Sequence, residues 1–140
     1  MENYIHRVQY YETDKMGITH HSNYVRWMEE ARVYFLNNNN CSYATIEKLG
    51  LASPVLEINC NYKKTTTFDD LVEIIIKLEE YNSVKMVYSY VMKNATTGEV
   101  VFCGKSKHCF INSEGRPINL KKVLPESDEK LKTLLLRENI

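Results

Sequence analysis

The chain of 140 residues lacks any hydrophobic run of the roughly 20 residues that a helix needs to cross a bilayer. It also lacks the apolar segment of a secretory signal, because its first residues carry charges. These two absences predict a protein of the cytosol with no stable membrane insertion.

Net charge is absent too, since 18 Lys and Arg residues balance 18 Asp and Glu residues, and nothing in this balance favours a nucleic acid partner. The four cysteines form no C-x-x-C pair, and without a secretory signal we expect free thiols. The four histidines show no recognised metal-ligand spacing, so no metal is predicted.

What is present is an ordinary globular composition, with 44% hydrophobic and 26% charged residues. The length predicts a single domain over residues 1–140. Residues 4–11 mix β-branched and aromatic types and predict a first strand. After a polar turn, residues 23–36 predict one long helix, capped by Ser22 or Asn23. Its buried face carries apolar residues at a spacing of three and four: Tyr24, Trp27, Met28, Ala31, Tyr34 and Phe35.

The long helix has a second apolar side, with Val25, Val33 and Leu36 nearly opposite the first, so something should cover it. The run Asn37 to Asn40 should end the helix, and residues 44–49 predict a short second one. Period-two patterns then predict strands at 55–67, 70–81, 84–93 and 99–112, which should follow one another as antiparallel neighbours. Residues after Pro125 predict a terminal helix.

This order of elements predicts an α+β domain in which a curved antiparallel sheet wraps round one long helix, the hotdog arrangement. Such a sheet leaves an edge strand and one flank of the helix uncovered. We therefore expect a homodimer that assembles to a homotetramer.

The segment from Tyr10 to Tyr24 concentrates titratable groups between a strand end and a helix start. The helix start favours a carboxylate such as Asp14, and its free amides can bind an oxyanion. From spacing alone, Asp14 is more often a turn residue. Tyr10 and Tyr24 suit packing, and His20 suits solvent. Glu29 lies on the second side of the helix, where it could enter an interface, a neighbour's site or a surface ion pair.

The segment resembles the opening motif of the 4-hydroxybenzoyl-CoA thioesterase-like family, closest to its branch of acyl-CoA thioesterases associated with the Tol-Pal system. The residues that carry the resemblance are Val8, Tyr10, Thr13, Asp14, Gly17, His21, Tyr24, Glu29, Ala31 and Arg32. Residues 69–71 and 115–117 are similar to the family more loosely. Glu12 stands where many members have Asp, and Ile18, Thr19 and His20 also depart from the pattern.

The resemblance implies an enzyme that hydrolyses short- to medium-chain or aromatic acyl-CoA to free acid and CoA without a cofactor. Asp14 would act as nucleophile or general base, and the His21 N–H would polarise the thioester carbonyl. The His21 ring and Tyr10 would orient water, carboxylate or carbonyl, while Gly17, Tyr24 and Glu29 would contact substrate. A basic patch should meet the CoA phosphates, and its candidates are Lys63, Lys64, Lys85, Lys105, Lys107 and Arg116.

Alternatives stay open. The same aspartate could cleave thioesters carried by acyl carrier protein, or the domain could bind acyl-CoA without turnover. A structural subunit of a membrane complex is a third possibility, although no separate interaction tail is present. The lack of an H-F-P-type motif disfavours a hotdog dehydratase.

Overall fold

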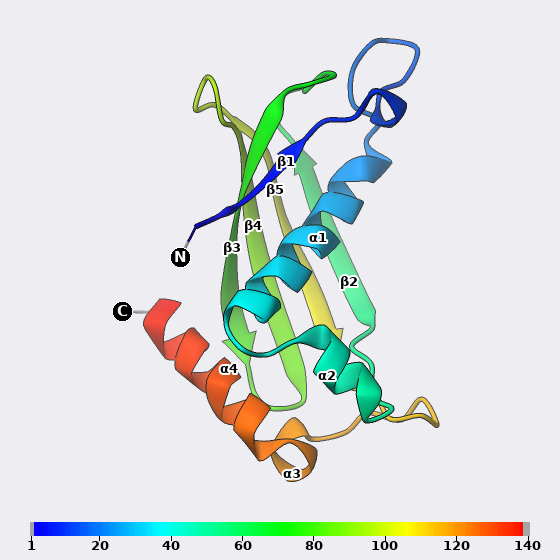
Figure 1. The fold of residues 1–140 in the computed structure, drawn as a ribbon. Coiled ribbons are helices and arrows are strands. Elements are labelled where there is room, and N and C mark those ends of the chain that lie inside the picture. The colour runs from blue at the N-terminus through cyan, green and yellow to red at the C-terminus, as the bar shows by residue number, and fades with distance from the viewer. Residues whose placement is uncertain (1, 139–140) are drawn as a thin grey trace. The chain divides into compact units, whose positions relative to one another are not determined.

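The computed structural model describes residues 2–138 (Figure 1). The elements, in chain order, are β1 (Tyr4–Arg7), the 3-10 helix η1 (Tyr10–Glu12), α1 (Ser22–Asn38), α2 (Tyr43–Lys48), β2 (Val55–Tyr62), β3 (Leu71–Tyr81), β4 (Lys85–Asn94), β5 (Val100–Cys109), α3 (Leu120–Val123) and α4 (Pro125–Glu138).

Most predicted elements are confirmed, with four corrections. The strand predicted over residues 4–11 ends at Arg7, because the Gln9 N–H binds the Glu12 side chain and tightens the chain into η1. The strand predicted over 55–67 ends at Tyr62, and α1 continues to Asn38, past the predicted break. The short helix α3, capped by the Asn119 side chain on the Lys121 N–H, was not predicted.

The five strands form an antiparallel sheet in the order β1-β3-β4-β5-β2. The predicted meander holds for β3, β4 and β5, but the prediction that β2 neighbours β3 is wrong. Residues 63–70 between them are too many for a tight hairpin, so β2 pairs with β5 instead and forms one edge. The other edge is β1, whose Tyr4 lies opposite Ile74 of β3.

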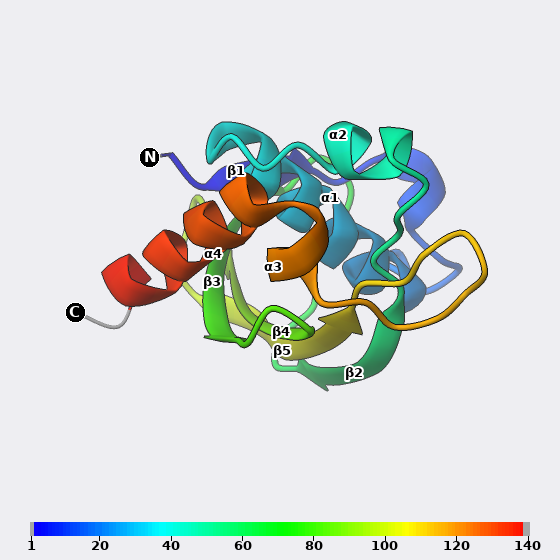
Figure 2. The same ribbon diagram turned by 90° about the horizontal axis from the view of Figure 1, so that it is seen from below.

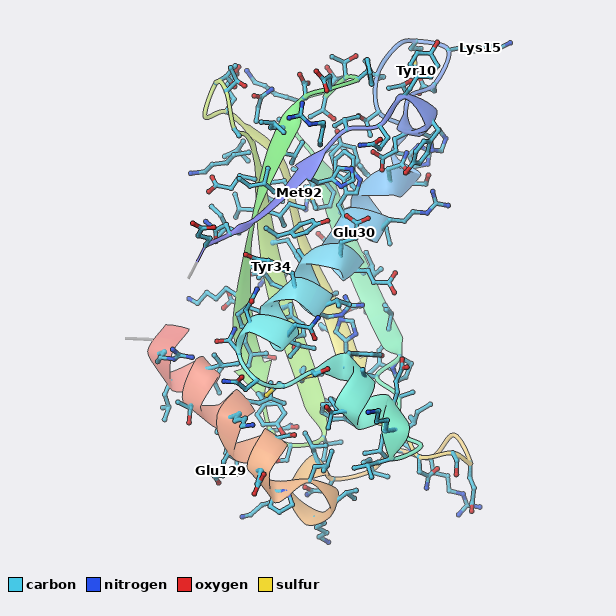
Figure 3. All side chains as sticks on the ribbon, viewed as in Figure 1. Tyr10, Lys15, Glu30, Tyr34, Met92 and Glu129 are labelled. Carbon is cyan, nitrogen blue, oxygen red and sulfur yellow. The ribbon has the colours of Figure 1, made fainter. Side chains whose placement is uncertain are left out.

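The chain divides into two compact units, and the first comprises residues 2–35, 60–76 and 90–104. Its core is the buried face of α1, on which Trp27, Ala31 and Phe35 are wholly buried, as the spacing predicts. Opposing them are the buried side chains of Val72, Ile74, Met92 and Phe102 from the strands. Figure 3 shows Glu30 and Tyr34 on α1, whose side chains contact Tyr4 of β1.

The second unit comprises residues 36–59, 77–89 and 105–138, and Figure 2 shows α3 leading directly into α4 there. The side chain of Asp128 on α4 is fully buried and accepts hydrogen bonds from the hydroxyls of Tyr81 and Ser83, each at 2.5 Å. Lys132 pairs with its other oxygen at 3.0 Å. These contacts fix α4 against the β3–β4 turn.

The predicted second apolar side of α1 is only partly open. Val25 and Val33 are half-buried, but Leu36 is 3% exposed and needs no further cover. All four cysteines are free thiols, as predicted. No helix within residues 2–138 is both long and apolar enough to cross a membrane.

Candidate active site

A tight loop carries Asp14 between η1 and α1. Thr13 and Thr19 form an antiparallel bridge at its base, and the Asp14 N–H donates to the Ile18 carbonyl at 2.9 Å. The loop turns at Gly17, whose φ of 78° is a left-handed conformation that glycine adopts without strain. The backbone thus holds Asp14 in a defined place.

The Asp14 carboxylate is half-buried and divides its two oxygens between structure and solvent. Oδ1 accepts the Met16 N–H at 2.8 Å, which closes the turn. Oδ2 has no hydrogen-bond partner among residues 2–138. One oxygen therefore anchors the side chain while the other is open for chemistry.

His21 immediately precedes the first residue of α1, where backbone N–H groups lack helical partners. Its own N–H donates to no other residue in the described part of the chain. Its carbonyl, by contrast, accepts the Tyr62 hydroxyl at 3.0 Å. The Tyr62 ring also lies perpendicular to the His21 ring, with centroids 6.3 Å apart.

Tyr62 acts as a hydrogen-bond donor at neutral pH. Burial, together with the neighbouring Cys60, raises the pKa of Tyr62 to about 12. The hydroxyl is therefore protonated and holds the His21 carbonyl, so a residue from the end of β2 fixes the start of α1.

A cavity of about 250 Å³ opens beside the loop. Asp14, His21, Tyr24 and Tyr62 line it together with Met16, Ile18, Thr19, Lys63, Lys64 and Thr65. Behind Tyr24 the ring of Phe102 stacks in parallel at 5.2 Å, and Tyr62 meets both rings edge-on at 5.3 Å. Part of the cavity lining is therefore aromatic.

Residues 63–65 of the connector between β2 and β3 also line the cavity, and hydroxyl groups tie this connector to the loop. Thr66 Oγ1 lies 2.6 Å from Thr19 Oγ1 and 2.9 Å from the Tyr24 hydroxyl. Thr67 Oγ1 donates to the Gly17 carbonyl at 2.7 Å. Loop and connector are consequently one hydrogen-bonded structure.

Two lysines stand on this connector. Lys64 pairs with Glu99, which neutralises it. The Lys63 ammonium has no acidic partner among residues 2–138. The cavity therefore combines one open carboxylate, one open backbone N–H and one unpaired cation.

The structure brings together Asp14, His21 and Tyr24 of the predicted site residues, with Gly17 at the turn of the loop. Tyr10 and Glu29 do not line the cavity. Tyr10 is 77% exposed and meets only the edge of the Phe68 ring, at the outer end of the loop in Figure 3, so the prediction that it packs inside is wrong. Tyr24, 3% exposed, does pack as predicted.

Asn23 does not cap α1 as predicted, because its side-chain amide donates to the carbonyls of Glu12 and His20 instead of accepting a helix N–H. Sequence reasoning also missed Tyr62 and the burial of Glu12. Tyr62 is remote in sequence, and Glu12 looks like part of a polar turn. For Tyr62 the only signal in the sequence was its spacing of two residues from Cys60, which puts both side chains on one face of a strand.

A sequence profile described as the thioesterase-like superfamily matches residues 8–134. The chain is 37% identical over 120 residues to YneP of Bacillus subtilis (strain 168), which is named as a candidate acyl-CoA thioesterase. That match covers 85% of this chain and 86% of YneP. The acyl-CoA thioesterase YbgC of Helicobacter pylori is 27% identical over 128 residues, covering 86% of this chain and 94% of YbgC.

Among solved structures, the DHNA-CoA thioesterase from Staphylococcus aureus matches with a TM-score of 0.94 and 32% sequence identity. The match covers 99% of this chain and 93% of that protein. Together with the profile match, it confirms the predicted α+β hotdog fold.

Proposed function

The chain belongs to the thioesterase-like superfamily, and we propose that it hydrolyses acyl-CoA thioesters with Asp14 as nucleophile or general base. One observation carries the proposal: Asp14 and His21 line the same cavity, the first with an open carboxylate oxygen and the second with an open backbone N–H. A thioester needs little more, because its carbonyl is electrophilic and its thiolate leaves readily.

In the general-base route, Asp14 takes a proton from water and the resulting hydroxide attacks the thioester carbon. The oxyanion that forms is stabilised by the His21 N–H at the positive end of the α1 dipole. The C–S bond then breaks, and the CoA thiolate leaves and takes up the proton. In the nucleophilic route Asp14 attacks the thioester carbon directly, the C–S bond breaks and the CoA thiolate leaves, and water then hydrolyses the mixed anhydride between Asp14 and the acyl group.

The favoured acyl group is aromatic. The cavity is small, at about 250 Å³, and its wall is built from Tyr24, Tyr62 and the Phe102 ring behind them. Flat rings contact such a wall by stacking and edge-on packing, which a flexible long chain does less well. The name of the similar Staphylococcus aureus protein, a DHNA-CoA thioesterase, agrees with a CoA carrier. Lys63 supplies a positive charge for a phosphate of that carrier.

The proposed roles of Tyr10 and Glu29 require a second subunit, because both side chains are exposed in one chain. We propose a homodimer that assembles to a homotetramer. Support comes from the edge strand β2, where Leu56, Ile58 and Tyr62 are 53%, 37% and 47% exposed. A particle of 16.4 kDa in light scattering at micromolar concentration would contradict this assembly.

Within the superfamily, the opening motif supports the Tol-Pal-associated branch as the nearest group. The decisive experiment is free-thiol release from a panel of benzoyl-, butyryl-, octanoyl- and palmitoyl-CoA, with an acyl carrier protein thioester alongside. We expect turnover with the CoA substrates and the highest kcat/KM for benzoyl-CoA. Thiol release no faster than without protein would contradict the hydrolase function and favour the alternative of an acyl-CoA-binding protein. A higher kcat/KM for the carrier-protein thioester would mean that acyl carrier protein, and not CoA, is the carrier.

A further inference from the structure

Glu12 ends η1 two residues before Asp14, and the residue is 4% exposed. Oε1 lies 2.8 Å from His6 Nε2 of β1 and accepts the Gln9 N–H at 2.8 Å. Oε2 accepts the Trp27 Nε1–H of α1, also at 2.8 Å. One carboxylate thus joins the strand before the loop to the helix after it.

This carboxylate is charged although it is buried. Burial raises the pKa of Glu12, but the hydrogen bonds from Gln9, His6 and Trp27 outweigh that effect and bring the pKa below its usual value. His6 is held on its other side too, with Nδ1 at 3.1 Å from a Glu30 oxygen that also accepts the Tyr4 hydroxyl. Each ring nitrogen of His6 therefore lies within hydrogen-bond distance of a carboxylate oxygen.

The backbone carbonyl of Glu12 continues the connection toward the site. It accepts the His20 N–H at 2.8 Å and the Asn23 side-chain amide at 2.9 Å. The same Asn23 amide reaches the His20 carbonyl at 3.2 Å, and the Asn23 backbone N–H donates to that carbonyl at 3.0 Å.

The His20 carbonyl and the His21 N–H belong to one planar trans peptide, in which the two groups point in opposite directions. Holding the carbonyl therefore fixes the direction of the N–H. The line of contacts runs from the Glu12 carboxylate, through the Glu12 carbonyl and the Asn23 amide, to the peptide that presents the His21 N–H.

We propose that Glu12 is a positioning residue for thioester hydrolysis, which aims the His21 N–H and sets the start of the Asp14 loop through its contacts to His6, Trp27 and Asn23. The role rests on the proposed hydrolase function. Glu12 does not line the cavity and touches no reacting atom. Its removal should therefore lower the rate of the chemical step more than it weakens substrate binding.

The test is Glu12→Gln, which keeps the size of the side chain but replaces one carboxylate oxygen, an acceptor, by an NH2 group, a donor. The partners of the Glu12 side chain are themselves donors. At least one of the three side-chain contacts must be lost. We expect kcat to fall by about 10- to 100-fold, the scale of a misdirected oxyanion donor, with KM within about threefold of wild type. Glu47→Gln is the matched control, because this substitution removes the same charge from an exposed residue of α2 that is far from the loop in sequence.

Trp27 is the only tryptophan of the chain, so ¹⁵N-tryptophan labelling gives a single indole N–H signal that reports on the bond to Glu12. In Glu12→Gln this signal should shift, and so should the backbone amide signals of His20 and His21 in uniformly ¹⁵N-labelled protein. In Glu47→Gln none of these signals should shift. A folded Glu12→Gln protein with kcat within twofold of wild type, or with unshifted His20 and His21 amides, would overturn the positioning role.

These readouts separate the two proposals. If wild-type protein releases no thiol from any substrate, the hydrolase function fails, while the amide shifts still decide whether Glu12 sets the His21 peptide. If Glu12→Gln does not fold, Trp27→Phe removes the same Oε2 contact and keeps an aromatic ring. We expect about a 3- to 10-fold lower kcat for Trp27→Phe, and an unchanged kcat would reject the proposal.

Discussion

Replacing Asp14 by Asn separates the chemistry of this side chain from its part in the turn. The structural contact of Asp14 is the bond from the Met16 N–H to Oδ1 at 2.8 Å. The Asn amide oxygen can accept the same bond, and Asn suits turns as well as Asp does. The fold of the loop should therefore survive the change.

The expected effect of Asp14→Asn on stability is much smaller than its expected effect on turnover. A hydrogen bond to a charged acceptor exceeds a neutral one by about 1 kcal/mol, and half-exposure of Asp14 reduces this further. For 140 residues, a loss of that size lowers Tm by about 3 °C. Losing the base or nucleophile should slow turnover by about 10²- to 10⁴-fold, which is about 3–5 kcal/mol of activation free energy.

The assay is thiol release from the best acyl-CoA substrate near pH 7, with thermal unfolding measured on the same preparations. Asp69→Asn is the control, because Asp69 is exposed, pairs with Arg7 on the surface and has a φ of 73° that Asn tolerates. Its kcat should stay near wild type. A folded Asp14→Asn protein that retains most of the wild-type kcat would remove Asp14 from the mechanism.

Three further outcomes follow from the contacts. Tyr62→Phe deletes the hydrogen bond to the His21 carbonyl. Denaturant titration should show a free energy of unfolding lower by about 0.5–1.5 kcal/mol, and thiol release should show a kcat lower by about 3- to 10-fold. No change in either quantity would mean that Tyr62 does not hold the helix start. Asp128→Ala leaves the hydroxyls of Tyr81 and Ser83 without their acceptor and should lower the free energy of unfolding by about 3–5 kcal/mol. The control is Glu129→Ala, because Glu129 faces outward on α4 in Figure 3, and it should lower the free energy of unfolding by under about 0.5 kcal/mol. Equal effects of the two changes would contradict the buried network. The pKa of Glu12 in the folded state lies below its unfolded value, so the stabilisation by its charge is present above the unfolded pKa of about 4.3 and is lost as pH falls through the folded pKa. Below pH 4.5 the Tm of the wild type should therefore drop more steeply with pH than the Tm of Glu12→Gln. Parallel curves of Tm against pH would argue that Glu12 is not charged in the fold.

Sequence predicted the elements whose periodicity is set by burial on one face. The helix from residue 23 and the strands near 71–81, 85–94 and 100–109 follow directly from such spacing. The place of β2 could not be read in this way. Strand order depends on how the connector of residues 63–70 crosses the sheet, and the composition of a loop does not encode that path.

For the site, the motif predicts that Asp14 and His21 lie close together, and both line one cavity, because they are local to one turn and one helix start. The prediction was less complete where the site depends on distant chain. Tyr62 reaches the His21 carbonyl across 41 positions, and Thr66 reaches Thr19 across 47. The burial of Glu12 arises from partners on both β1 and α1, so a polar turn in sequence became an interior charge in the fold.

The pairing of β1 with β3 also bears on how the protein is made. Tyr4 lies opposite Ile74, so the first strand has no partner until 70 further residues have been synthesised. At about 5–20 residues per second, that delay is about 4 to 14 s. The Asp14 loop waits as well, because it closes against Thr66 and Thr67. The segment that carries Asp14 and His21 therefore cannot complete its hydrogen bonds until residues 47 to 50 positions further along the chain have been synthesised.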